Sequence, residues 1–144
     1  MFTEISENEF FSIAYDPIQY IGIYELNWLM DDNLLDCEGI IVAFEKAKIL
    51  ISSKKLGEDD FDFVYYEFPQ EYECRKILSS FEEPIHFIRK ESEENSYRYL
   101  RFQIGNRPIL VTAYKDEWID VGLSHWDIND EWLEFENNHL LNDS

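Results

Sequence analysis

Alternation between apolar and polar residues, with a period of two, constrains the fold of this chain more than any other feature. The stretch "YIGIYELNWLM", from residue 20, places Ile21 and Ile23 on one face. The stretch "FDFVYYEF" places Phe61, Phe63 and Tyr65 on one side. Successive side chains of a β-strand point to opposite faces, so this period predicts strands that bury one face.

Further strands and turns follow along the chain. The stretch "GIIVAFEKAKILIS" predicts one long strand or two, because Ile40, Ile41 and Val42 make it too β-branched for a helix. The stretches "DDNLLDCEG" and "KKLGEDD" are expected to be turns or loops. The stretches "PIHFIRKE" and "EWIDVGLS" are expected strands, and "EWLEFE" is a candidate last strand. Gly105-Asn106, between "YRYLRFQI" and "RPILVTAY", is typical of a two-residue hairpin turn.

Two segments favour helix. In residues 5–15, Ser6 and Glu9 have the spacing of a capping box, and Ile5 precedes them as a hydrophobic staple. The stretch "PQEYECRKILSSF" is a second candidate, because Pro69 suits the first turn of a helix. Long parallel crossovers are absent from this pattern, which therefore predicts antiparallel strands.

The expected fold class is α+β. We expect an antiparallel β-sheet meander of five to eight strands, with an N-terminal helix and room for one further helix. At 144 residues, 45% of them hydrophobic, the chain has enough apolar surface for one core. Residues 1–144 are expected to form a single acidic α+β domain, with residues 138–144 as a frayed tail.

Negative charge is concentrated at the two ends of the sequence. The formal net charge is -19, and all twelve lysines and arginines lie between Lys46 and Lys115, together with twelve acids. Residues 1–45 contain ten acids and residues 116–144 contain nine, with no lysine or arginine in either segment. If the two ends meet in space, as termini often do, they form one strongly negative surface.

No catalytic or cofactor motif is found. The five glycines, at 22, 39, 57, 105 and 122, are too scattered for a phosphate-binding or dinucleotide-binding loop. Asp127, Asn129 and Glu131 resemble the start of a calcium-binding loop, but Trp132 stands where that loop needs glycine. We therefore expect no metal, no cofactor and no enzymatic activity. A hydrolase that uses two carboxylates is kept as an alternative, because any two of the 31 acids could meet in a cleft.

The expected location is the cytoplasm. The N-terminus has acids where a secretory signal needs basic residues, and no apolar run approaches the roughly 18 residues of a membrane span. Cys37 and Cys74 are isolated from each other and from any metal-binding spacing. Both are expected to be free thiols of a reducing compartment.

Nucleic acid is not an expected partner. Binding to phosphate backbones needs clustered basic residues, and Arg98, Arg101 and Arg107 form the only local cluster. These arginines are expected to pair with acids across neighbouring strands, for which Glu91, Glu93 and Glu94 are candidates. The excess of negative charge favours a basic protein as the partner.

The segment from Asp116 to Glu136 combines eight carboxylates with three tryptophans and contains no lysine or arginine. On a strand, Ile119, Val121 and Leu123 would face the core, while Trp118, Asp120 and Gly122 would share the other face. Aromatic residues on an acidic outer face are typical of interface anchors inside a charged rim.

In its overall character the chain resembles the small acidic bacterial immunity proteins of polymorphic and contact-dependent growth-inhibition toxin systems. The resemblance covers the length, the acidic ends, the α+β pattern and the absence of catalytic motifs. It implies an inhibitor that covers the active-site cleft of a basic toxin, for which a nuclease is the expected activity. An adaptor for another basic partner, or charge that serves solubility alone, are the alternatives. The residues expected to bind the partner are Asp31, Asp32, Asp36, Asp116, Glu117, Trp118, Asp120, Trp126, Asp127 and Asp130.

Overall fold

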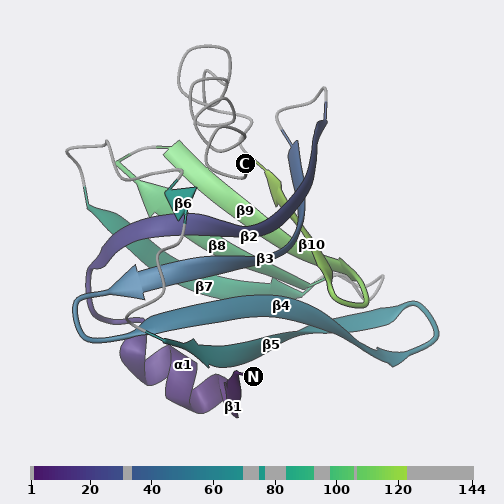
Figure 1. The fold of residues 1–144 in the computed structure, drawn as a ribbon, viewed down its shortest axis with the longest axis horizontal. Coiled ribbons are helices and arrows are strands. Elements are labelled where there is room, and N and C mark those ends of the chain that lie inside the picture. The colour runs from purple at the N-terminus through teal and green to yellow at the C-terminus, as the bar shows by residue number, and fades with distance from the viewer. Residues whose placement is uncertain are drawn as a thin grey trace.

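A computed structural model describes residues 2–30, 34–69, 75–76, 84–92, 98–105 and 107–122. Within these ranges the chain forms one helix and ten strands (Figure 1). Their bounds are β1 Thr3–Ile5, α1 Glu7–Ile13, β2 Ile18–Met30, β3 Leu34–Phe44, β4 Lys48–Gly57, β5 Asp60–Phe68, β6 Arg75–Lys76, β7 Ile85–Ser92, β8 Arg98–Ile104, β9 Arg107–Lys115 and β10 Trp118–Gly122.

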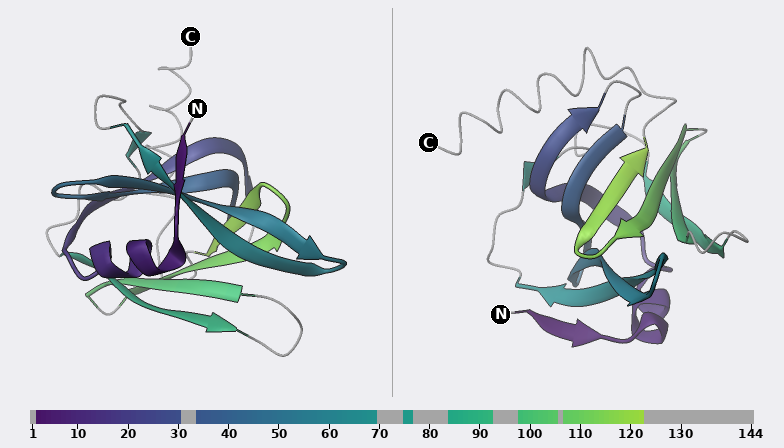
Figure 2. Two further views of the ribbon diagram at one scale, coloured as in Figure 1. Left: turned by 90° about the horizontal axis from the view of Figure 1, so that it is seen from below. Right: turned by 90° about the vertical axis from the view of Figure 1, so that its right-hand side faces the viewer.

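The strands form two antiparallel meanders, β2 to β5 and β7 to β10, that are joined into one sheet. Strand β10 pairs with β3, and β2 meets β7 at Ile18 and Ile85, so the pairing runs from β3 through β10, β9, β8, β7 and β2 back to β3. Figure 2 shows β10 beside β3, and β1 beyond β5 at one end of the strand order. The predicted antiparallel meander with one N-terminal helix is confirmed, although the sheet has more strands than the eight expected.

The period-two pattern places the core where it was predicted. Ile21 and Ile23 are buried on β2, and Phe63 and Tyr65 are buried on β5. On the last described strand, Ile119 and Val121 are 0% exposed, which confirms the predicted inward face of β10. The largest cluster of buried residues includes side chains from ten of the eleven elements and fills the space between the two meanders.

Helix α1 begins as the capping box predicts. The Ser6 hydroxyl accepts a hydrogen bond from the Glu9 backbone N–H at 3.1 Å, which satisfies one of the free donors of the first turn. Phe10 faces inward, stacks on Tyr65 with ring centroids 4.6 Å apart, and meets the edge of Phe87. These contacts hold the helix against β5 and β7 and exclude water from that end of the core.

Three local predictions differ from the structure. Residues 34–39 were expected in a loop but form the first half of β3, because they pair with both β2 and β10. In "KKLGEDD" only Glu58 and Asp59 form the turn. The expected helix from Pro69 is wrong at Arg75 and Lys76, which pair with β2 as β6. The rest of that helix, the candidate strand "EWLEFE" and the tail lie outside the described residues.

Strand β3 changes partners at Gly39. Its first half pairs with β10 and its second half pairs with β4 on the same edge. Side chains at Cys37 and Ile40 both face the core, so the alternation shifts between them. A Cβ atom at Gly39 would lie 2.8 Å from the carbonyl oxygen of Ile51, so only glycine fits this close approach of β3 to β4. The shift leaves Glu38 on the outer face at the junction of the two meanders.

Several bases of the middle segment pair with acids of α1, β5 and β7. Lys90 lies 2.8 Å from both Glu7 and Asp62, and Arg98 lies 2.7 Å from Asp60. The predicted pairing of Arg101 with Glu91 is confirmed at 3.3 Å. Arg98 instead reaches across to β5, and Glu93 and Glu94 lie outside the described residues.

Cys37 is buried as a free thiol, and burial raises its pKa, so the protonated form predominates. Cys74 lies outside the described residues. Among the residues that the structure places, no helix combines the length and the apolar character that crossing a membrane requires.

Candidate partner-binding site

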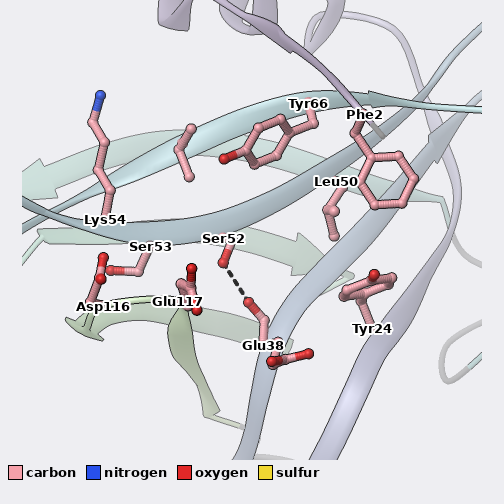
Figure 3. A pocket seen from close by; sticks show the side chains of 11 residues that line it. Phe2, Tyr24, Glu38, Leu50, Ser52, Ser53, Lys54, Tyr66, Asp116 and Glu117 are labelled. Carbon is pink, nitrogen blue, oxygen red and sulfur yellow. Dashed lines mark hydrogen bonds between the residues drawn. The ribbon is translucent and has the colours of Figure 1, made fainter.

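A groove of about 380 Å³ lies on the outer face of β3, β4 and β5, beside the turn between β9 and β10 (Figure 3). Its walls combine an aromatic end and an acidic end, with serines between them. The lining residues are Phe2, Tyr24, Glu38, Leu50, Ser52, Ser53, Lys54, Val64, Tyr66, Asp116 and Glu117. We refer to this depression as the acidic groove.

The aromatic end is a small second core on the outside of the sheet. Phe2 stacks on Phe68 with centroids 5.2 Å apart and meets the edge of Tyr24 at 5.9 Å. Tyr66 and the buried Leu50 complete this cluster. Phe2, Tyr24 and Tyr66 keep part of their surface exposed, so apolar area remains open to the groove.

The acidic end is built where Glu38 of the base-free N-terminal segment meets Asp116 and Glu117, the first two residues of the base-free C-terminal segment. Glu38 stands on β3 next to Gly39, and its carbonyl oxygen accepts a hydrogen bond from the Ser52 hydroxyl at 2.6 Å. Asp116 and Glu117 form the two-residue turn between β9 and β10. Two bonds fix this turn to β4: the Glu117 N–H donates to the Ser53 carbonyl at 2.9 Å, and the Lys55 N–H donates to Asp116 Oδ1 at 3.0 Å.

Two glutamates beside Glu38 have strained backbones. Glu25 has a φ of 54° and Glu117 has a φ of 64°, both in the left-handed region that disfavours residues with a Cβ. Among the described residues, Asp59 is the third residue other than glycine with a left-handed backbone. It occupies the β4–β5 turn, where aspartate is tolerated. Strain of this kind concentrates at functional sites, where the surrounding structure holds it in place.

Burial and nearby negative charge together raise the pKa of Glu38 and Tyr66, two groups that line the groove. Burial, followed by the charges of Glu25 and Glu117, raises the pKa of Glu38. Burial and nearby carboxylates, among them Glu117, also raise the pKa of Tyr66. Lys54 is the one base in the lining, and within the described ranges it forms no ion pair with a groove carboxylate. The groove therefore carries uncompensated negative charge.

The structure brings together some of the residues predicted to bind a partner. Asp116 and Glu117 line the groove. Trp118 is half-buried and lies outside the groove, with the Lys115 ammonium 4.8 Å from the centre of its ring. The other predicted positions, Asp31, Asp32, Trp126, Asp127 and Asp130, lie outside the described residues.

Asp36 and Asp120 form a pair of their own. They lie directly opposite each other in the β3–β10 ladder, on the face away from the core. Asp36 is only 6% exposed, and neither residue lines the groove. A hydrolase needs its paired carboxylates open to a substrate, whereas Asp36 is almost fully covered and Asp120 is half-buried. Among the described residues, no three histidine, cysteine or acidic side chains are grouped so as to hold a metal ion.

Sequence reasoning did not identify Phe2, Tyr24, Glu25, Glu38 and Tyr66 as parts of the site. Four of these residues lie in the base-free N-terminal segment, where the charge of Glu25 and Glu38 was the available signal. No protein-family model, curated protein or solved structure matches this chain.

Proposed function

We propose that this chain is an immunity protein that binds a basic toxin domain and blocks the active-site cleft of that toxin with the acidic groove. The toxin activity that we propose is that of a nuclease. The observation that carries the proposal is the clustering of Glu25, Glu38 and Glu117 without a basic partner among the described residues. Clustered like charges destabilise the free protein, and a basic partner would remove that cost.

The groove combines the two features that a protein interface requires. Its carboxylates would steer a positively charged partner toward it and raise the association rate. Phe2, Tyr24 and Tyr66 offer partly exposed rings for apolar contact, which mainly slows dissociation. A nuclease cleft suits this arrangement, because it is lined with basic residues that bind phosphates.

The test compares two triple variants with the same change in net charge. Glu25, Glu38 and Glu117 are changed to glutamine in the first. Glu9, Asp16 and Glu45, which are exposed and lie outside the groove lining, are changed to the matching amides in the second. The partner is the toxin domain encoded immediately upstream, in a catalytically inactive form, and association is followed by stopped flow at low and high salt.

The groove variant should associate about tenfold more slowly or worse at low salt, and the control variant should stay close to the wild type. The difference should shrink at high salt, because the screening length falls to roughly 3 Å at 1 M. Tyr66→Ala should weaken affinity by about 2 kcal/mol through faster dissociation if the ring is an anchor. Equal slowing by the two triple variants would mean that only the total charge matters. A partner that does not bind at all, or the lack of a toxin domain upstream, would contradict the immunity function.

A further inference from the structure

Asp36 and Asp120 lie close together in a place where two ionised carboxylates are unfavourable. They are direct partners in the antiparallel pairing of β3 and β10, which puts their Cβ atoms roughly 5 Å apart. Asp36 is 6% exposed, and Asp120 is half-buried. The Oδ1 atom of each carboxylate is buried and has no hydrogen-bond partner.

The groups around this pair do not neutralise it. Tyr114, from β9, has its hydroxyl within hydrogen-bonding reach of both carboxylates. A hydroxyl has a single proton, so it can donate to only one of them at a time. The Cys37 thiol is next to Asp36 in sequence, and β2 places Trp28, which has no titratable group, opposite Asp36. In the part of the chain that the structure describes, no base forms an ion pair with either aspartate.

A single proton would resolve both problems at once. It would remove one of two facing negative charges, and it would supply the donor that the two Oδ1 atoms lack. Burial, followed by the charge of Asp36, raises the pKa of Asp120 to about 6, while the hydrogen bond from Tyr114 acts in the opposite direction. Proton uptake in mildly acidic solution is consistent with this value.

We propose that Asp36 and Asp120 form a proton-binding pair: one shared proton joins β10 to β3 in mildly acidic solution, and its loss at neutral pH loosens this strand pairing. The inference is independent of the proposed partner. The folded chain binds this proton more tightly than the unfolded chain, in which an aspartate has its ordinary pKa of 3.8. The stability from the pair is therefore greatest at low pH and is lost as the pH rises through about 6.

The test follows the carboxyl carbons of Asp36 and Asp120 by NMR across a pH series, together with the hydrogen-exchange protection factors of the Ile119 and Val121 amides. In the wild type the Asp120 carboxyl carbon should show a step near pH 6. The protection factors should fall by about tenfold or more through that step. Asp120→Asn should abolish this pH dependence, and Asp16→Asn, at an exposed position, should leave it unchanged.

Three results would overturn the proposal. The Asp120 carbon could finish titrating below about pH 4.5, as exposed aspartates do. Asp120→Asn could retain the pH dependence of the wild type. Calcium or magnesium chloride at neutral pH could restore protection in the wild type but not in Asp120→Asn, which would identify the pair as a cation site. If Asp120→Asn does not fold, the proposal is tested by the wild-type carbon titration and by Asp36→Asn, which should also abolish the pH dependence of protection.

Discussion

Carboxylates occupy two regions of this molecule in opposite ways. Beside α1, the acids of α1 and β5 surround two bases, with Lys90 between Glu7 and Asp62 and Arg98 against Asp60. At the junction of β3 with the β9–β10 turn, carboxylates gather with no basic partner among the described residues. The first arrangement joins elements distant in sequence, whereas the second leaves its charge available to another molecule.

The contrast has a simple origin in the sequence. All of the bases lie between Lys46 and Lys115, so the paired acids are those that contact β7 and β8. The acids of the acidic groove come from the base-free segments, and among the described residues none of them forms an ion pair. Removal of one charge from the region of paired charges should destabilise the protein. Removal of a negative charge from the acidic groove should stabilise it.

The largest effect is expected for Lys90→Met, in the region of paired charges beside α1. The Lys90 side chain is only 16% exposed, so its removal leaves the partly buried Glu7 without its counter-charge and Asp62 with only Arg98, at 3.9 Å. Unfolding in urea should show a loss of about 2–3 kcal/mol. Arg89→Met serves as the control, because that side chain is 59% exposed and should matter little. Similar stability of the two variants would show that the Lys90 contacts do not hold the elements together.

A smaller effect of opposite sign is expected for Glu117→Gly in the acidic groove. Glycine adopts the left-handed backbone without strain, and the change also removes a charge next to Glu38. After the entropic cost of glycine, the free protein should be stabilised by about 1 kcal/mol. Asp59→Gly is the matched control, because it relieves the backbone strain of a left-handed residue in a turn outside the groove lining. An equal gain from Asp59→Gly would mean that charge at Glu117 contributes nothing.

The smallest effect is expected for Glu38→Gln, and it should depend on pH. Because the pKa of Glu38 is raised in the folded protein, ionisation of this group costs stability as the pH increases. Glutamine avoids that cost and should stabilise the protein by about 0.5 kcal/mol at neutral pH. The gain should vanish in acid, where Glu38 is protonated, and Glu45→Gln should show no such trend. A gain that is independent of pH would point to a packing effect instead.

Local features of the sequence determined most of the secondary structure. The period of two predicted the inward faces of β2, β5 and β10, because a strand alternates its side chains whatever its neighbours are. Ser6 and Glu9 predicted the start of α1, because the cap is made within four residues. The pattern did not distinguish a loop from β3 at residues 34–39, since that segment is a strand only through its pairing with β2 and β10.

Charge composition indicated that the site would be acidic, but only the tertiary structure decided which acids form it. The pairing of β10 with β3 brings Asp120 opposite Asp36. Asp36 is thereby buried, although composition alone would place it at the surface. The close approach of β3 to β4 at Gly39 sets Glu38 beside Glu117. Register between strands that are distant in sequence is selected by packing of the whole core, and no local preference of the residues involved encodes it.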